Sequence, residues 1–589
     1  MEKQMQTFID VFEAETKDAE RVQREVLERI LNENGEAEYL KKFGLDGKWD
    51  EETFRKCVPL ASHHDLMPYI NRIADGDASP LLAAKPFTAL SWSSGTTGGK
   101  PKLVPFNLAL SSTVTLHTTC LAYALRILEF SVTEGMFLRF LFISPRHKSK
   151  GGLDIGPVSS HLYYQSSSEM KGNEIELLEP CSPKEVAIAR NYRQSLYCYF
   201  LCGLLHRDQN PYFEAFFCNL MVEAFRAFES IWEELCGDIR EGVLSDIRVS
   251  DPVVRESVSK LLKPNPGLAD SIYQKCKVLQ SENWYGLIPE LWPQAKFVMT
   301  ILTGSMEAYV GKLRHYAGDK LGFVSRVYGA SEGLIAINIR PPISVEYSDV
   351  YVYAACPSSV YLEFIPLKRS NLTETKTEEG LYEESDPVRL TEVKVGEIYE
   401  IVITNYAGLY RYRLGDIVKV TGLYNSSPEL QFLHRKNVLL NISVDKTTER
   451  DLQLVMEEAS KLLLTEEKVE IVDYTSYADS SKEPGHYVIF WELTSRAPSG
   501  EMLRKCCSYL DQSLPEPDYI TARKSRWLDA LELRIVAKGT FGRITDHYQS
   551  LGSSIVQFKT PRCIAGSNTR VLQILDDNVS ARFFSTAYA

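Results

Sequence analysis

The run of residues best suited to binding a ligand is SSGTTGGKPK at residues 93–102. It follows a predicted strand at residues 87–92. Glycine and hydroxyl residues after a strand expose backbone N–H groups and O–H donors, which a phosphate group requires. The run therefore predicts a phosphate-binding loop, and the alternative is a flexible hairpin. It does not match GxxxxGK[ST], because Gly95 to Gly99 is one residue short and Pro101 stands at the Ser/Thr position. It also lacks GxGxxG, which disfavours a nicotinamide-dependent Rossmann enzyme.

A second run, YGASEG at residues 328–333, contains the literal pattern G-x-S-x-G of serine hydrolases, with Asp416 and His434 following in the order Ser, Asp, His. A nucleophile elbow requires a helix after the turn, whereas residues 334–339 (LIAINI) predict a strand. The hydrolase interpretation is therefore disfavoured. A carboxylate between two strands near a phosphate loop suits Mg²⁺, which takes oxygen ligands and bridges nucleotide phosphates. Glu332 is thus the candidate metal ligand, and its alternative is a solvated turn acid.

Two further runs gain meaning only beside the first two. In YRYRLGD, residues 410–416, the glycine frees the backbone and Asp416 can accept hydrogen bonds from both hydroxyls of a ribose. In QFKTPR, residues 557–562, Lys559 follows the uncharged run 551–558. Alone, the first predicts a turn and the second a surface lysine.

Together and in this order, the four runs resemble the acyl-adenylate-forming superfamily that includes firefly luciferase and the acyl-CoA ligases. Within it the chain resembles the plant, auxin-inducible acyl acid amido synthetases first named the Gretchen Hagen family. The resemblance spans nearly the whole chain and also includes TGSM at residues 303–306, YLEFIP at 361–366, NYAGLYR at 405–411 and KTPRC at 559–563. The interval between the 93–102 loop and Glu332 contains the helical segment that is typical of this family's acyl-site insert.

The resemblance implies a role for each matching residue. The phosphates of ATP would be held by Ser93, Ser94, Gly95, Thr96 and Thr97. The nucleotide pocket would be lined by Thr303, Gly304, Ser305 and Tyr328, with Tyr353 stacking on adenine. Glu332 would bind Mg²⁺ and Asp416 the ribose. Lys559, carried by a rotating C-terminal domain with a hinge near Arg435 and Lys436, would neutralise charge on the phosphoryl or adenylate group.

This division of labour suits the chemistry of amide formation. A carboxylate reacts poorly with amines because its leaving group is oxide, so it first attacks the α-phosphate of ATP while Mg²⁺ and lysine offset the charge. A neutral amine then attacks the acyl-AMP and AMP departs. Rotation of the C-terminal domain between the two steps would replace the residues used for adenylation by those used for amide formation. The cofactors expected are ATP and Mg²⁺, and the substrates are a small acyl acid and a free amino acid. An acyl-CoA ligase or a catalytically inactive binding protein are the competing functions.

The acyl acid is expected to contact the predicted helix at residues 108–129. Its candidate contacts are Val114, Leu116, Thr118, Cys120 and Leu121. In the benzoate- and salicylate-handling branch of the family an arginine is expected where this chain has Leu121. The apolar leucine indicates an indole auxin with a carboxylate tail, and we expect indole-3-butyrate in particular. Benzoate and jasmonate substrates are the alternatives.

These residues need a mixed α/β scaffold. Helices are predicted at residues 9–42, 108–130, 183–206 and 211–237, and a helix at 449–464 follows an N-cap at Thr447 or Thr448. Strands are predicted at residues 296–302, 323–328, 334–339, 360–365, 397–404, 416–421, 430–433, 487–493 and 532–537. We expect a luciferase-like N-terminal domain of mixed sheets and helices, residues 1–435, which binds ATP and acid. A small mobile α/β C-terminal domain, residues 436–589, would carry Lys559.

The composition agrees with an ordinary globular protein. The 589 residues are 44% hydrophobic and 24% charged, with a net charge of −12. An acidic balance argues against nucleic-acid and anionic-membrane partners. The twelve cysteines form no CxxC pair and the ten histidines no zinc motif, so reduced thiols and an oxygen-ligated metal are expected. The acidic N-terminus and the lack of a long apolar stretch predict a cytoplasmic protein, and we expect a monomer.

Overall fold

The computed structural model describes most of the chain. The described residues are 2–45, 50–97, 100–106, 112–127, 135–144, 146–169, 179–189, 191–340, 351–369, 382–436, 439–440, 442, 447–494, 498–551, 558–564 and 568–588. Gly98 and Gly99 of the predicted phosphate loop lie outside them. The same holds for the side chains of Ser93, Ser94, Thr96, Thr97 and Val114.

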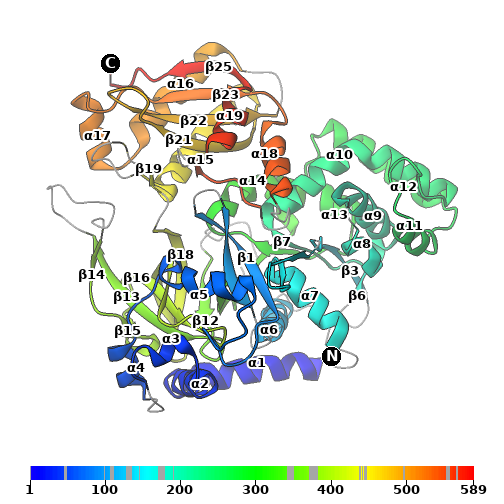
Figure 1. Ribbon diagram of the computed structural model, residues 1–589. Helices are drawn as coiled ribbons and strands as arrows, with labels where there is room; N and C mark the ends of the chain where they lie inside the picture. Colours follow the sequence, from blue (N-terminus) through cyan, green and yellow to red (C-terminus); the bar gives the residue numbers. More distant parts are fainter. Residues whose placement is uncertain are drawn as a thin grey trace.

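The largest sheet of the body has nine strands and carries Tyr328, Tyr353 and Asp416 of the predicted nucleotide residues (Figure 1). In spatial order its strands are β10 (Val327–Ala330), β11 (Gly333–Ile337), β12 (Tyr353–Ala355), β18 (Ser427–Arg435), β17 (Tyr412–Tyr424), β16 (Ile398–Thr404), β13 (Tyr361–Arg369) and β14 (Tyr382–Glu384), with β15 (Val388–Arg389) paired to β13. Every neighbouring pair is antiparallel. The order places β17, which carries Asp416, beside β18, so that Asp416 lies opposite Arg435 in the register.

A second sheet of the body is parallel, with the order β6 (Glu179–Pro180), β3 (Met136–Phe140), β7 (Tyr212–Phe217), β8 (Phe297–Ile301) and β9 (Gly322–Ser325). The helix predicted at residues 211–237 is wrong at its start, because β7 precedes α10 (Cys218–Glu241). The run YFEAFF is largely buried, and a short buried run has no periodicity that separates a strand from a helix. Other helices of the body are α6 (Ser112–Ile127), α8 (Lys184–Ala187), α9 (Tyr192–Leu205), α12 (Pro266–Ser281) and α14 (Glu307–Ala317).

The predicted phosphate loop belongs to a four-stranded sheet with the order β2 (Lys100–Phe106), β1 (Ala89–Thr97), β5 (Asp154–Gly156) and β4 (His147–Lys148). Strands β1 and β2 form an antiparallel hairpin whose register shifts between Trp92 and Thr96. The strand predicted at residues 87–92 thus extends to Thr97, and the loop and the hairpin are one feature of the chain.

The C-terminal part, which we call the cap, lies above the body in Figure 1. Its sheet has the order β24 (Cys563–Ile564), β21 (Ile471–Asp479), β22 (His486–Leu493), β23 (Glu532–Val536) and β25 (Val579–Phe584). Its helices include α15 (Glu449–Glu467), α16 (Gly500–Ser513), α18 (Thr540–Ser550) and α19 (Thr569–Asp576). The Thr448 hydroxyl accepts from the backbone N–H of Asp451, which confirms the predicted N-cap of α15.

The apolar cores of body and cap are separate. Described core residues of the body end at Leu430, with Leu433 packed against them, and those of the cap begin at Leu440. The expected hinge residues Arg435 and Lys436 lie in this interval. A large mixed α/β domain followed by a smaller α/β domain confirms the predicted fold class.

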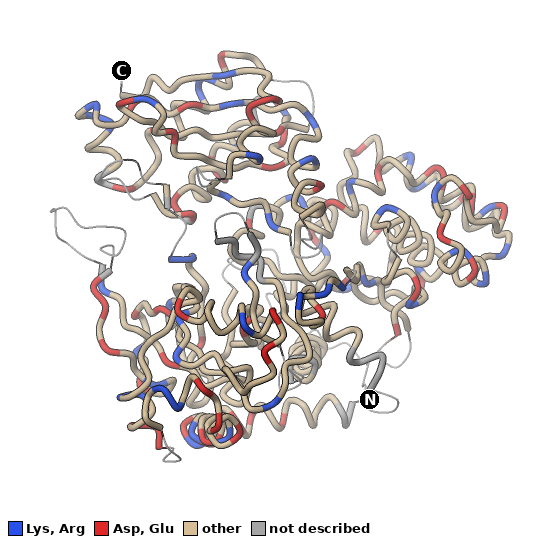
Figure 2. The backbone as a smooth tube through the Cα atoms, in the orientation of Figure 1, with Lys and Arg blue, Asp and Glu red and all other residues tan. Residues whose placement is uncertain are grey.

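Charged residues and thiols are distributed over both body and cap. Figure 2 shows basic and acidic residues interspersed over body and cap. All twelve cysteines are free thiols. Among the described residues, no helix combines the length and apolar character needed to cross a bilayer.

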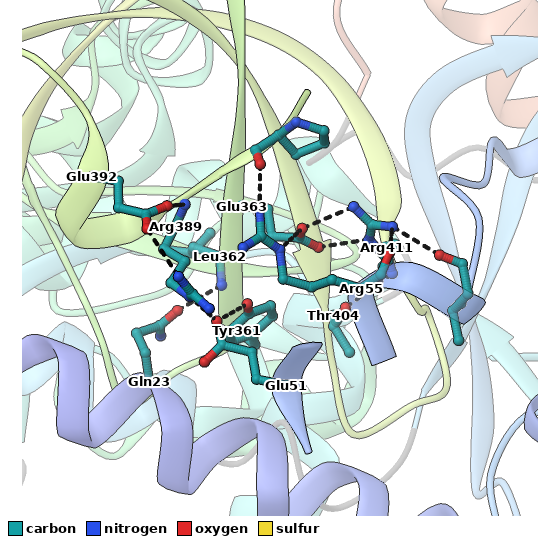
Figure 3. A network of polar contacts seen from close by, with 12 residues as sticks. Gln23, Glu51, Arg55, Tyr361, Leu362, Glu363, Arg389, Glu392, Thr404 and Arg411 are labelled. Atoms are coloured by element: carbon teal, nitrogen blue, oxygen red, sulfur yellow. Dashed lines mark hydrogen bonds and ion pairs between the residues drawn. The ribbon is translucent and has the colours of Figure 1, made fainter. Parts of the chain in front are cut away.

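A buried ion-pair network fixes the N-terminal segment to the large sheet (Figure 3). The guanidinium of Arg411 donates from Nε and Nη2 to the two carboxylate oxygens of Glu363, at 2.9 and 3.0 Å. Its Nη1 donates to the carbonyl of Val58 at 2.8 Å, and Arg55 contacts the same carboxylate at 3.1 Å. Residues more than 300 positions apart are therefore joined through one carboxylate.

We expect Arg411→Met to lower the free energy of unfolding by about 3–5 kcal/mol, because it leaves a buried carboxylate with less compensation. The matched control is Arg21→Met, which removes an exposed pair with Asp18 and Glu25 and should cost at most about 1 kcal/mol. Urea unfolding measures both losses. Equal losses would show that the buried network has no special weight.

Candidate active site

Asp416 lies where the large sheet meets the cap. Its side chain is 3% exposed, Oδ2 accepts from the Tyr328 hydroxyl at 3.0 Å, and Oδ1 accepts from Arg435 Nε at 3.1 Å. The antiparallel register of β17 and β18 creates the pair with Arg435. Arg435 was expected only as a hinge residue, and its contact with Asp416 is an additional finding. A carboxylate has about four acceptor sites, so Asp416 retains capacity for ribose hydroxyls.

Glu332 lies in the turn between β10 and β11 and is 7% exposed. Its Oε1 accepts from the Tyr412 hydroxyl at 3.4 Å, and its backbone carbonyl accepts from Asn405 Nδ2 at 2.6 Å. Lys102, from strand β2, is close enough to Glu332 to interact electrostatically. Burial lowers the pKa of Lys102, and the charge of Glu332 opposes that shift. Lys102 and Tyr412 were not among the predicted site residues, although both stand in the runs that predicted the site.

The donor set around Glu332 fits Mg²⁺ only together with a nucleotide. In the described part of the chain there is no group of three or more His, Cys, Asp or Glu that could hold a metal by itself. Mg²⁺ in nucleotide sites typically takes one or two carboxylates and completes its shell with water and phosphate oxygens. One buried carboxylate beside a phosphate-type hairpin meets that requirement.

Ser331 is not arranged as a nucleophile. Its hydroxyl donates to the carbonyl of Trp92 at 3.2 Å, and the chain continues directly into strand β11. The predicted strand after the motif is confirmed, and the strand–turn–helix of a nucleophile elbow does not occur here.

The predicted adenine side is built around a turn at Thr303, Gly304 and Ser305. Gly304 has a φ of 64°, and a Cβ there would lie 3.1 Å from the ring of Phe432. The Tyr353 hydroxyl lies 2.6 Å from Ser325 Oγ and 3.4 Å from Thr303 Oγ1, and the tyrosine is 1% exposed. Stacking of Tyr353 on adenine would therefore require its neighbours to move. Phe432 is only partly buried, and the centre of its ring lies 5.9 Å from the centre of the Tyr328 ring. Phe432 was not among the predicted site residues.

Lys559 lies on the side of the cap that faces the body. Its Nζ lies 4.5 Å from the centre of the Phe217 ring. Burial lowers the pKa of Lys559 to about 8, Arg435 adds to the decrease, and Glu449 and Asp416 oppose it. The structure therefore brings Lys559 into the electrostatic range of Asp416 and Arg435.

Polar contacts hold the cap in this position. Gln453 Nε2, on α15, donates to Glu307 Oε2 at 3.1 Å and to the carbonyl of Gly304 at 3.3 Å. Lys312 forms an ion pair with Glu470 of the cap at 3.3 Å. The cap thus contacts the same turn that the sequence assigned to the nucleotide.

Helix α6 does not present all five predicted acyl-site residues to one side. Leu116 and Cys120 are 6% and 1% exposed and pack in a core with Ile9 and Phe12 of α1 (Glu2–Lys17). Thr118 and Leu121 are only partly buried, and Leu121 packs against the edge of the same core. Leu116 and Cys120 are therefore core residues, which corrects the prediction.

Comparison with known proteins identifies the class. Three family models match: the GH3 family N-terminal domain over residues 8–321, the central domain over 353–435 and the C-terminal domain over 450–568. The chain is 51% identical over 582 residues to the jasmonoyl–L-amino acid synthetase JAR4 of Nicotiana attenuata, covering 98% of this chain and 97% of that protein. It is 44% identical over 602 residues to a probable indole-3-acetic acid-amido synthetase, GH3.12, of Oryza sativa subsp. japonica, covering 98% and 96%.

A solved acyl acid amido synthetase, AtGH3.15 in complex with 2,4-DB, superposes with a TM-score of 0.85 at 33% identity, covering 100% of this chain and 98% of that one. Fold and site define a ligase that joins an acyl acid to an amino acid with ATP. The chain belongs to the GH3 family, as the resemblance in its motifs predicted.

We expect the rate of the first half-reaction, formation of the acyl-adenylate, to fall as the pH rises through about 8. Lys559 loses its proton in this range, and with it the positive charge that offsets the negative phosphoryl oxygens. Below that pH the lysine is protonated and the rate should be constant. ATP–pyrophosphate exchange between pH 6 and 10 measures the profile.

Lys559→Arg should abolish that inflection, since arginine stays protonated throughout the range. Lys102→Arg is the matched control, because the pKa of Lys102 is also lowered, and it should keep the inflection. A fall at the same pH in the Lys559→Arg variant would assign the titration to another group.

Proposed function

We propose that this chain makes an amide between an amino acid and a plant-hormone-type acyl acid through an acyl-adenylate. A carboxylate oxygen of the acid attacks the α-phosphorus of ATP and pyrophosphate leaves. The amino nitrogen then attacks the acyl carbon, the bond to AMP breaks, and the proton from nitrogen passes to solvent. The observation that supports this best is the convergence of Asp416, Glu332 and Lys559, from distant parts of the chain, around Tyr328 and Arg435.

The residues have distinct roles in this proposal. Asp416 orients the ribose, while the β1–β2 hairpin presents backbone N–H groups to the phosphates. Glu332 holds Mg²⁺, which supplies positive charge to the phosphate oxygens. Lys559 faces the phosphoryl group and offsets the charge that develops there, in a partly buried site where each charge counts for more than in water.

For the acid, a jasmonate-type substrate has the strongest support, since the relatives that are 50–51% identical are named jasmonoyl–L-amino acid synthetases. Auxin-type acids are the second candidate, supported by relatives that are 37–44% identical. Within that candidate, indole-3-butyrate is favoured by the partly exposed, apolar Leu121. We also propose a cytoplasmic monomer, supported by twelve free thiols and by the mixed charges of the surface.

Glu332→Gln should reduce ATP–pyrophosphate exchange by about 100- to 1000-fold, because a neutral amide would hold Mg²⁺ more weakly than a carboxylate. The neighbouring Ser331→Ala is the control and should retain exchange, since no step uses that hydroxyl. Loss of activity in the serine variant and not in the glutamate variant would revive the hydrolase interpretation.

The acid substrates can be ranked by their kcat/KM values in ATP–pyrophosphate exchange. The panel is jasmonic acid, indole-3-butyric acid, indole-3-acetic acid and benzoic acid. Product mass with amino acids and with CoA then separates an amido synthetase from an acyl-CoA ligase. A benzoate that turned over best would overturn both candidates for the acid.

A further inference from the structure

Four polar side chains meet in the body beside helix α6. We call them the Arg326 cluster: Arg326, between β9 and β10, Glu214 of β7, His117 of α6 and Arg139 of β3. Arg326 Nη1 forms an ion pair with Glu214 Oε1, and Nη2 donates to His117 Nδ1 at 3.1 Å. Arg139 Nε donates to the other carboxylate oxygen of Glu214 at 3.2 Å.

The cluster carries one positive charge in excess. His117 is neutral, because burial and the cation of Arg326 lower its pKa to about 3. Glu214 is ionised, because the cations of Arg139 and Arg326 outweigh the effect of burial and hold its pKa at about 2. Two guanidinium groups thus face one carboxylate.

One donor of the cluster has no partner. Arg326 is 8% exposed, and its buried Nε–H makes no hydrogen bond to any group in the described residues. An unsatisfied buried donor costs about 1–3 kcal/mol, more for a charged group. A ligand oxygen that accepted from Nε would recover that cost.

Two residues close to the cluster along the chain, Phe217 and Tyr328, contact residues of the proposed catalytic site. The guanidinium of Arg326 lies 5.1 Å from the ring centre of Phe216, and the next residue, Phe217, contacts Lys559 at 4.5 Å. Two residues beyond Arg326, Tyr328 donates to Asp416. An acid whose carboxyl group reacts beside Lys559 would therefore extend toward Arg326.

We infer that Arg326 is a specificity-determining residue of the acyl site, and that its Nε–H donates to a neutral acceptor oxygen that the acid carries apart from its reacting carboxyl group. This inference rests on the proposed function and narrows its substrate class to keto or hydroxy acids. A second carboxylate gains less here than beside an unpaired arginine, because Glu214 already offsets one of the two guanidinium charges. An indole ring offers an N–H donor to a site that itself offers donors. A cyclopentanone acid of the jasmonate type meets the requirement.

The test uses two acids that differ only in one ring ketone, (3-oxocyclopentyl)acetic acid and cyclopentylacetic acid. The readout is the ratio of their kcat/KM values in ATP–pyrophosphate exchange. The wild type should favour the ketone by about 10- to 100-fold, the range for a hydrogen bond to a charged group.

Arg326→Lys keeps a cation for Glu214 but removes the Nε–H donor, and should bring the ratio close to one, mainly by slowing the ketone. Arg139→Lys is the matched control: it touches the same carboxylate, leaves Arg326 intact and should preserve the ratio.

A wild-type ratio near one would overturn the inference even if the lysine variant fails to fold, and so would an Arg326→Lys variant that kept the wild-type preference. The inference would also be overturned if the enzyme accepted neither probe and used only acids that carry no oxygen outside the carboxyl group. Failure of the proposed function is distinct, since no acid of the wider panel would then support exchange.

Discussion

The contact between Arg411 and Glu363 anchors the chain immediately before β17, the strand that carries Asp416. Arg411 has a φ of 45°, a left-handed conformation that is unfavourable for a side chain of its size. The paired hydrogen bonds to Glu363, together with those to the backbone of the N-terminal segment, hold the residue in that conformation. The next residue, Tyr412, reaches Glu332, and Asp416 follows four positions later. One buried guanidinium thus orients the proposed ribose and metal ligands together.

Local charge in the site opposes the charge of the whole protein. The chain has a net charge of −12, yet ATP and the acid are anions. The site contains three partly buried cations that can attract these anions: Lys102, Arg435 and Lys559. Each lies close to Glu332 or Asp416. Each carboxylate stabilises its neighbouring cation while the nucleotide is absent, and buried charges are screened less by salt than surface charges. Binding of anions is therefore a property of this junction, and the global balance does not determine it.

The junction of body and cap is suited to a reaction in two steps. The cap meets the body through polar contacts such as Gln453 with Glu307 and the partly exposed pair of Lys312 and Glu470. A hydrogen bond of this kind contributes about 0.5–1.5 kcal/mol net, because its groups bond to water when the contact opens. The described core residues of body and cap belong to separate clusters, so no apolar packing shared between those clusters opposes movement. Rotation of the cap between the two steps stays a prediction.

The sequence by itself determined the reaction class, because the residues that identify it stand in short runs whose chemistry is local: the hairpin with residues 93–97, the turn with Glu332, the turn before Asp416 and the segment with Lys559. It also predicted most strands after residue 296, where β-branched and aromatic residues alternate with turns. Only the tertiary structure decided that residues 212–217 form a strand, since the same buried apolar run fits a helix until its neighbours are known. It likewise assigned Leu116 and Cys120 to the core and paired Arg326 with Glu214 across 112 positions. Such pairs depend on which strands lie side by side, and strand order arises from packing of the whole chain, so spacing along the sequence does not reveal it.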